Sequence, residues 1–411
     1  MKMLFNLPYA SITRLKKMTL NNHQGSLERP SYLLVDVSII SGHDAGTGIQ
    51  RVVRSIASLI AQISILGYDI RFVAATRKKP YRPIAYASRP ALPVDEMRAL
   101  RDGDLFLGLD FCSAVLPANR RQIRQWRKRG VRCHYLVYDL LPQSNPEWFT
   151  PKSVQNYRRW FRFVTTTSDG LLCISQHVRN QLESSLAESG ARSVRTATIR
   201  LSGDVGQATR VGTEKLPSEI TLAKVNFTNF ILMVGTIEPR KGYDDALDIY
   251  QHVLEKMESA APQLVIVGRP GWKSDATQNR LRRLSQSGHI IWLDDACDVQ
   301  LQLLYDRCKG VFYTSLGEGF GLPLAESLKN RKPAFARNLE VFQEFSDKNV
   351  TFFENRTAQA ISQKMINWIS ELNGYSFQDS SENLNPECWM DATKAIVDFM
   401  VYDNSHHQSH N

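Results

Sequence analysis

The sequence predicts an α/β protein with two domains, each built on a parallel β-sheet covered by helices. Short buried apolar strands alternate with stretches of helical periodicity, and this scheme starts afresh in the second half of the chain. The length of 411 residues fits two or three domains, and 43% hydrophobic with 22% charged residues is ordinary globular composition. This composition excludes a disordered, a collagenous and an integral-membrane protein.

The first half opens with a strand at residues 32–37, which ends in a glycine-containing loop at 41–48. Residues 49–66 then place apolar side chains at helical spacing. A densely basic helix is predicted at 122–129. The further strands that we predict in this half lie at residues 69–74, 105–109, 133–138 and 170–174.

The second half repeats the scheme with a strand at residues 230–236 and a helix at 243–260. The further strands that we predict lie at residues 263–268, 290–293, 310–314 and 333–336, with a charged helix at 279–287. The polar stretch 202–225 is the natural linker, with a hinge near 205–225. Open α/β sheets bind ligands at the carboxyl ends of their strands, so we expect a ligand-binding cleft between two Rossmann-like domains.

These elements divide the chain into four parts. We expect an N-terminal extension at residues 1–30, a first Rossmann-like domain at 31–215, a second at 216–375, and a C-terminal segment at 376–411. The C-terminal segment should hold one helix, near residues 386–402, and a disordered tail. No stretch of 18 apolar residues occurs, so no membrane-spanning helix is expected.

The cysteines and the N-terminus bear on the compartment. The six cysteines are widely spaced, without a C-x-x-C pair or a histidine at metal-ligand spacing, so neither a zinc site nor a disulfide scaffold is expected. They are typical of a cytosolic protein. Residues 1–20 lack a secretory signal; they form either a frayed extension or a basic amphipathic anchor.

The formal net charge of +10 is unevenly distributed along the chain. Residues 1–215 hold 32 Lys and Arg against 16 Asp and Glu, whereas residues 216–411 hold 19 against 25. A basic first half indicates an anionic partner, which could be a nucleic acid, a phospholipid surface or a phosphorylated substrate.

The motif that most strongly indicates a functional site is a glycine-rich loop, which follows the predicted strand at 310–314. Glycines at 317, 319 and 321 let the backbone approach a ligand closely, and the amides at the start of the next helix can donate to hydroxyls or phosphate. Glu318 lies in this loop and Glu326 eight residues later, about two helical turns on. Two such carboxylates could hold two diol-bearing groups of one nucleotide sugar. The alternative is a glycine-rich turn before an amphipathic helix, with Glu326 exposed to solvent.

This motif resembles the Glu-x7-Glu signature of the retaining glycosyltransferases of the GT-B fold, a group that includes bacterial mannosyl- and rhamnosyltransferases. The resemblance implies two Rossmann-like domains facing across a cleft, and a C-terminal helix around Trp389 that crosses back to the first domain. It also implies that Glu318 contacts the donor sugar and Glu326 the ribose of the nucleotide. The other residues expected to bind the donor are Gly48, Gly319, Phe320, Gly321 and Leu322.

Residues 234–242 look like the loop of this family in which basic side chains hold the donor diphosphate. Lys241 matches the usual lysine, and Arg240 takes the place of an arginine that is Thr236 here. The alternative is a solvated helix start, but two cations at a helix N-terminus oppose its dipole unless an anion joins them.

Three residues of the first half also fall on family motifs. Asp139 would contact the sugar or the acceptor, or else cap a helix. Tyr138 stands where the family commonly has histidine. Arg51 would bind an anionic acceptor or form a salt bridge on a helix surface. Ser175 matches a serine that opens a helix, for which capping is a sufficient reason, and His134 and His177 are expected to be structural.

The function implied by the resemblance is that of a retaining hexosyltransferase, with GDP-mannose as the first candidate donor and dTDP-rhamnose or a UDP-sugar as alternatives. Its acceptor would be a lipid-linked or growing saccharide in surface polysaccharide or lipopolysaccharide synthesis. We expect no metal and no other cofactor. The basic half is then expected to attract an acidic membrane surface, at the inner face of the plasma membrane, rather than nucleic acid. The alternative function is that of a non-catalytic scaffold subunit that binds nucleotide sugars.

Overall fold

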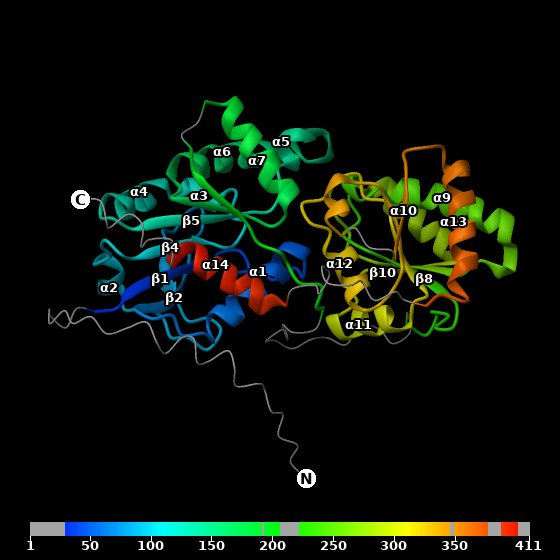
Figure 1. The fold of residues 1–411 in the computed structure, drawn as a ribbon, viewed down its shortest axis with the longest axis horizontal. Coiled ribbons are helices and arrows are strands. Elements are labelled where there is room, and N and C mark those ends of the chain that lie inside the picture. The colour runs from blue at the N-terminus through cyan, green and yellow to red at the C-terminus, as the bar shows by residue number, and fades with distance from the viewer. Residues whose placement is uncertain (1–28, 191–192, 206–221, 346–348, 377–387, 402–411) are drawn as a thin grey trace, which may run out of the picture. The chain divides into compact units, whose positions relative to one another are not determined.

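The computed structural model describes residues 29–190, 193–205, 222–345, 349–376 and 388–401 (Figure 1). The expectations for the N-terminal extension, most of the linker with its hinge, and the C-terminal tail concern residues outside this part and stay predictions. Ser31–Asn411 forms one compact unit that contains two sheets.

The first sheet has seven strands in the order β3-β2-β1-β4-β5-β6-β7. All neighbouring strands are parallel except β2 and β3, which pair antiparallel at one edge. The strands are β1 (Ser31–Asp36), β2 (Tyr68–Ala74), β3 (Arg82–Ile84), β4 (Leu105–Gly108), β5 (Arg132–Val137), β6 (Gly170–Cys173) and β7 (Arg195–Thr198). The central strands β4 and β6 are buried along their whole length, because helices cover both faces of a parallel sheet.

The helices of this domain connect the strands of the sheet, and the three longest of them, α1, α6 and α7, begin at a residue whose side chain caps the helix. Thr47 caps α1 and exchanges hydrogen bonds with Gln50 in a capping box, while Thr150 caps α6. The helices are α1 (Gly48–Ile60), α2 (Val94–Arg98), α3 (Val115–Ala118), α4 (Arg120–Lys128), α5 (Leu141–Ser144), α6 (Pro151–Thr167) and α7 (Gln176–Glu188), with a 3-10 turn at Pro146–Trp148.

The second sheet has six parallel strands in the order β10-β9-β8-β11-β12-β13. Its strands are β8 (Phe230–Val234), β9 (Gln263–Val267), β10 (Ile290–Leu293), β11 (Gly310–Tyr313), β12 (Ala334–Arg337) and β13 (Val350–Phe353). Its helices are α9 (Tyr243–Met257), α10 (Asp275–Leu284), α11 (Asp298–Arg307), α12 (Leu322–Lys329) and α13 (Ala358–Leu372), with 3-10 turns at Pro239–Lys241 and Glu340–Phe345.

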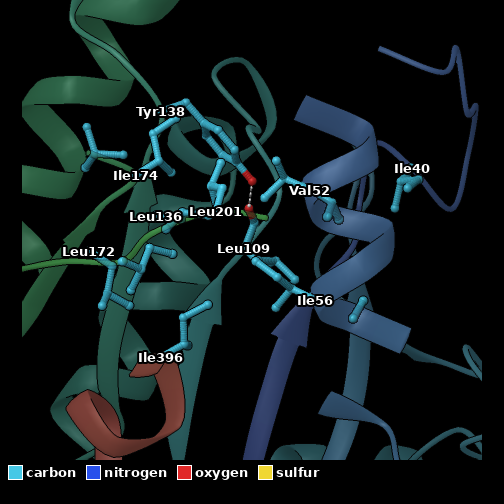
Figure 2. Close-up of a cluster of buried hydrophobic side chains, with 14 of the residues drawn as sticks. Ile40, Val52, Ile56, Leu109, Leu136, Tyr138, Leu172, Ile174, Leu201 and Ile396 are labelled. Carbon is cyan, nitrogen blue, oxygen red and sulfur yellow. Dashed lines mark hydrogen bonds between the residues drawn. The ribbon is translucent and has the colours of Figure 1, made fainter. Parts of the chain in front are cut away.

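The last described helix, α14 (Trp389–Val401), packs on the first domain rather than the second. It contacts α1 (Figure 1), the indole N–H of Trp389 donates to the carbonyl of Asp204 at 3.1 Å, and Arg195 lies over the ring of Phe399. Figure 2 shows Ile396 of this helix in one apolar cluster with Leu172 of β6. The predicted crossing of the C-terminal helix back to the first domain is therefore confirmed.

The element boundaries differ from the sequence predictions at several helix ends. The helix predicted at 49–66 ends at Ile60, and the chain then turns into β2 through Gly67, which has a positive φ of 82°. The helix predicted at 279–287 runs from Asp275 to Leu284 and continues as a 3-10 turn. The short edge strand β3 was not predicted, since it contains Pro83 and has only three residues.

No helix within the described ranges combines the length and the apolar character that crossing a membrane requires. All six cysteines are free, and five of them are buried.

Candidate active site

Glu318 lies at the centre of a buried cluster of charged side chains. Its carboxylate accepts from the hydroxyl of Ser315 at 2.8 Å and from Arg240 Nη1 at 2.8 Å, and it forms an ion pair with the ammonium of Lys241. Burial alone would raise the pKa of Glu318, but the charges of Lys241 and Arg240 lower it to about 2. Glu318 is therefore ionised at neutral pH.

Arg240 and Lys241 reach this cluster from the 3-10 turn that follows β8. Arg240 Nε lies 2.6 Å from Oε1 of Glu238, although neither oxygen of Glu238 has hydrogen-bonding geometry to a partner. Burial raises the pKa of Glu238, against the lowering effect of Arg240. Gly242 ends the turn in the left-handed conformation, and α9 starts directly after it. The two cations thus stand at a helix N-terminus and are balanced there by carboxylates.

The glycines around Glu318 are required by close backbone contacts. A Cβ atom on Gly319 would overlap the carbonyl oxygen of Tyr138, so this segment fits against the residue that follows β5 only without a side chain. Gly321 has a φ of 94° and starts α12. The ring of Phe320 is buried against Phe345, at a centroid distance of 5.0 Å, so only its backbone amide could meet a ligand.

Glu326 is buried one to two turns into α12 and bonded through both oxygens. The phenol of Tyr305 donates to Oε2 at 2.7 Å, and Arg51 of α1 forms an ion pair with Oε1. Arg51 also lies 3.3 Å from Asp298 at the start of α11. Arg51 was predicted to bind an acceptor or to form a salt bridge on a helix surface. It does form a salt bridge, but the pair is nearly buried and joins residues 275 positions apart, while a role in acceptor binding stays a prediction. The interpretation of Glu326 as merely solvated is wrong.

Asp139 lies within the same charged cluster as Glu318. Its Oδ1 accepts from the amide of Leu141 at 3.1 Å in a local turn, whereas the N-cap position of α5 is Leu140 and not Asp139, and burial raises the pKa of Asp139 despite the nearby charge of Arg240. Asp139 is therefore both a turn residue and a neighbour of the candidate catalytic cations.

Tyr138 does not offer its hydroxyl to a ligand. The phenol points into the core and donates to the carbonyl of Leu109 at 2.8 Å, as Figure 2 shows. Its backbone, by contrast, contacts Gly319. A role of this side chain in place of the family histidine is excluded by that orientation.

The two predicted glycine-rich segments meet at helix starts. Gly48 is the first residue of α1, and a Cβ atom there would lie 3.3 Å from the side chain of Leu322, the first residue of α12. The structure therefore brings four of the predicted residues together in one cluster: Glu318, Arg240, Lys241 and Asp139. The helix starts at Gly48 and at Gly319–Leu322 lie beside this cluster, and so does the buried Glu326.

Two further predictions concern structural side chains. Ser175 caps α7 as expected, accepting from the amide of Val178 at 3.1 Å, and it also donates to the carbonyl of Gly319 at 2.6 Å, which the sequence did not predict. His134 is buried, and burial lowers its pKa to about 3, so it stays neutral as a core residue.

Several residues of the site were not predicted. Ser315 could have been found from its position three residues before Glu318 in the same loop. Tyr305 and Asp298 belong to α11, a helix that the sequence analysis did not identify, so no local signal pointed to them. Among the described residues, no group of three or more His, Cys, Asp or Glu side chains could hold a metal ion.

Comparisons with known proteins indicate the family that this chain resembles. Residues 220–378 match the family model described as glycosyl transferases group 1, so the resemblance seen in the sequence is confirmed for this region. The chain is 29% identical over 377 residues to the serotype-specific mannosyltransferase WbdA of Escherichia coli. That match covers 89% of this chain and 44% of WbdA, so the chain spans less than half the length of this curated relative.

Solved structures support the fold. Sucrose-phosphate synthase from Thermosynechococcus elongatus has a TM-score of 0.60 at 13% identity, covering 92% of this chain and all of that one. HepE from Anabaena, solved with UDP-glucose, has a TM-score of 0.56 at 17% identity, covering 90% and 94%. The predicted GT-B fold, with two parallel-sheet α/β domains, is confirmed.

Proposed function

Because residues 220–378 carry a domain of the glycosyl transferases group 1 family, we propose that the chain transfers a hexose from a nucleotide-diphosphate sugar to a saccharide acceptor, with retention of anomeric configuration. The observation that carries this proposal is the charged cluster in which buried Glu318 is ionised between Arg240 and Lys241, next to the start of α12. Such a site combines a carboxylate for sugar hydroxyls with cations for phosphate.

Each residue of the cluster has a definite task in this proposal. Glu318 orients the donor sugar, and Arg240 with Lys241 neutralises the charge that develops on the leaving diphosphate. The amides at the start of α12, from Gly319 to Leu322, donate to hydroxyl and phosphate oxygens, with the Gly48 loop near the phosphate. Glu326 binds the ribose after its ion pair with Arg51 opens. Asp139 contacts the sugar or the acceptor.

The transfer itself follows from the charges of this site. The bond between the anomeric carbon and the diphosphate oxygen breaks while the acceptor oxygen bonds to the same face of that carbon. The proton of the acceptor hydroxyl passes to the leaving diphosphate oxygen, so in this proposal no protein side chain forms a bond to the anomeric carbon. Since Arg240 and Lys241 supply positive charge, we expect transfer to proceed without a metal or another cofactor.

The proposal extends to the donor sugar, the acceptor and the cellular location. The likeness to the mannosyltransferase WbdA supports mannose as the sugar that is transferred. GDP-mannose is therefore our first candidate donor, ahead of dTDP-rhamnose and UDP-sugars. The acceptor would be a lipid-linked or growing saccharide of a surface polysaccharide such as lipopolysaccharide. The enzyme would act in the cytoplasm, at the inner face of the plasma membrane, where the basic half of the chain meets acidic lipids.

The proposal is tested by incubating the full chain with GDP-mannose, UDP-sugars and dTDP-rhamnose, each with saccharide acceptors, in the presence of a chelator. We expect one donor to give an α-linked product whose configuration is read by NMR. Glu318→Gln should lower the transfer rate about hundredfold or more. Glu255→Gln, which alters an exposed carboxylate of α9, is the matched control.

Two results would contradict the proposal. Full transfer by Glu318→Gln would show that the site is elsewhere. Binding of a nucleotide sugar without turnover by the wild-type chain would favour the scaffold function. Thermal shift with each nucleotide separates these cases, because a ligand at 100 times its Kd stabilises the fold by about 2.7 kcal/mol.

A further inference from the structure

Two aromatic rings from different domains stack beside the Glu318 loop. Phe149, which follows the 3-10 turn Pro146–Trp148, and Trp272, in the loop between β9 and α10, have ring centroids 5.9 Å apart and an interplanar angle of 26°. Trp272 is 38% exposed and is the one aromatic residue among the exposed large hydrophobic side chains of the described chain. Because aromatic side chains commonly line ligand sites, an exposed aromatic ring next to a candidate active site is a candidate for ligand binding.

The two loops that carry these rings are fixed to each other. The indole N–H of Trp272 donates to the carbonyl of Trp148 at 2.9 Å, and the ammonium of Lys273 donates to the carbonyl of Glu147. The loop of Trp272 is also joined to the loop of Arg240 by the bridge between Ile237 and Pro270. Since the indole N–H of Trp272 already donates to Trp148, the exposed part of this side chain offers an apolar ring surface and no donor.

The rings lie close to the candidate reaction centre. A Cβ atom on Gly317 would come within 2.8 Å of the ring of Trp148, so Trp148 packs on the backbone immediately before Glu318. The other carboxylate, Glu326, faces Arg51 of α1 and Tyr305 of α11 instead. The aromatic pair is thus next to the sugar-binding end of the proposed site. Glu326, the proposed ribose-binding residue, lies among other elements, α1 and α11.

We infer that Phe149 and Trp272 form a subsite that binds a pyranose ring of the saccharide acceptor. A pyranose has an apolar face of C–H groups, which packs on an aromatic surface, while its hydroxyls remain free for water and polar side chains. A saccharide whose reacting hydroxyl faces the donor sugar held by Glu318 would pass Trp148 and place a neighbouring sugar on these rings. This inference rests on the proposed function and adds the position of the acceptor chain.

Steady-state kinetics with Trp272→Ala test the subsite. The variant should raise the KM for the saccharide acceptor about tenfold and leave the KM for the nucleotide sugar unchanged. Trp272→Phe keeps an aromatic ring but loses the hydrogen bond to Trp148, so it should behave like the wild type. If Trp272→Phe is as impaired as Trp272→Ala, the hydrogen bond and not stacking accounts for the effect, and the subsite is overturned. Leu66→Ala, at a side chain that is 81% exposed in the turn before β2, is the control.

A binding experiment separates this inference from the proposed function. Saturation-transfer NMR with α-linked mannotriose, and with maltotriose for comparison, needs no turnover. We expect the wild type and Trp272→Phe to bind mannotriose and Trp272→Ala to lose that binding, with unchanged thermal stability. Equal binding by the wild type and Trp272→Ala, or no binding of either trisaccharide to the wild type, overturns the subsite. Absence of transfer from any nucleotide sugar with saccharide binding intact would contradict the proposed function alone.

Discussion

At the scale of single residues, Glu318 shows how a buried carboxylate is kept charged. Three carboxylates, of Glu318, Glu238 and Asp139, surround the two cations Arg240 and Lys241. Only Glu318 has close, hydrogen-bonded partners for both oxygens, and only its pKa falls. The lowered pKa of about 2 stabilises the folded state above pH about 4.5, and this contribution is lost as the pH falls through about 2.

Asp36 shows the opposite case, at the end of β1. It is fully buried and accepts from the amide of Ser38 at 2.9 Å and from the phenol of Tyr81 at 2.7 Å. Burial, and then the charge of Asp110, raise its pKa to about 7 in spite of these hydrogen bonds. The folded state therefore holds a proton here that the unfolded chain releases near pH 3.8.

The raised pKa of Asp36 predicts a pH dependence of stability. Between pH about 4 and 7 the folded state binds more protons than the unfolded one, so the contribution of Asp36 to the free energy of unfolding falls as the pH rises. The slope is at most about 1.4 kcal/mol per pH unit. Urea denaturation at several pH values should show Asp36→Asn gaining stability relative to the wild type over this range. Parallel curves for the two proteins would contradict the prediction; Asp95→Asn, at an exposed carboxylate, is the control.

At the scale of elements, α1 and α12 are joined by the ion pair of Arg51 and Glu326. Arg51 is 12% exposed and Glu326 1%, so the pair is largely removed from water. Arg54, one turn further along α1, pairs with Asp298 of α11 at 3.3 Å. Removing one member of a buried pair leaves the other without compensation, whereas removing both is tolerated better.

A double-mutant cycle should therefore show strong coupling between Arg51 and Glu326. We expect Arg51→Met and Glu326→Gln each to destabilise the fold by about 3–5 kcal/mol, and the double variant to lose less than the sum. Guanidinium denaturation of the four proteins gives the coupling free energy. Additive losses would mean that the two side chains do not interact, and the more exposed pair of Arg179 and Glu183 should give at most about 0.5 kcal/mol.

At the scale of the whole molecule, the positive charge of the first half is concentrated on two helices. Helices α4 and α6 carry no acidic residue. Helix α4 lies in the connection from β4 to β5, and α6 in the connection from β5 to β6. Both connections step in the same direction along the sheet, so the two helices cover the same face of it (Figure 1). We call their exposed cations the basic face; its members are Arg120, Arg121, Arg124, Lys128, Lys152, Arg158, Arg159 and Arg162.

The basic face predicts binding to anionic membranes. The full chain should sediment with vesicles that contain phosphatidylglycerol and not with pure phosphatidylcholine, and less so at high salt. Each lost cation weakens binding by about 1 kcal/mol, so Arg121→Glu with Arg124→Glu should weaken it about tenfold or more. Arg283→Glu with Arg307→Glu makes the same change in net charge on α10 and α11. Equal loss in both double variants would show that net charge, and not this face, determines binding.

Much of the fold could be predicted from the sequence because its signals are local. The alternation of apolar strands and helices depends on neighbours a few residues apart, and so does the capping role of Ser175. The same holds for the eight-residue spacing of Glu318 and Glu326. Helix ends were less predictable, as at Ile60, because the turn that follows a helix decides them.

The sequence by itself determined the α/β class, the two sheets and the loop that carries Glu318. Only the tertiary structure decided that Arg51 pairs with Glu326, that the hydroxyl of Tyr138 is used inside the core, and that Phe149 stacks on Trp272. The physical reason is sequence distance. These contacts join residues between 29 and more than 270 positions apart, and chain folding rather than any local pattern brings them together.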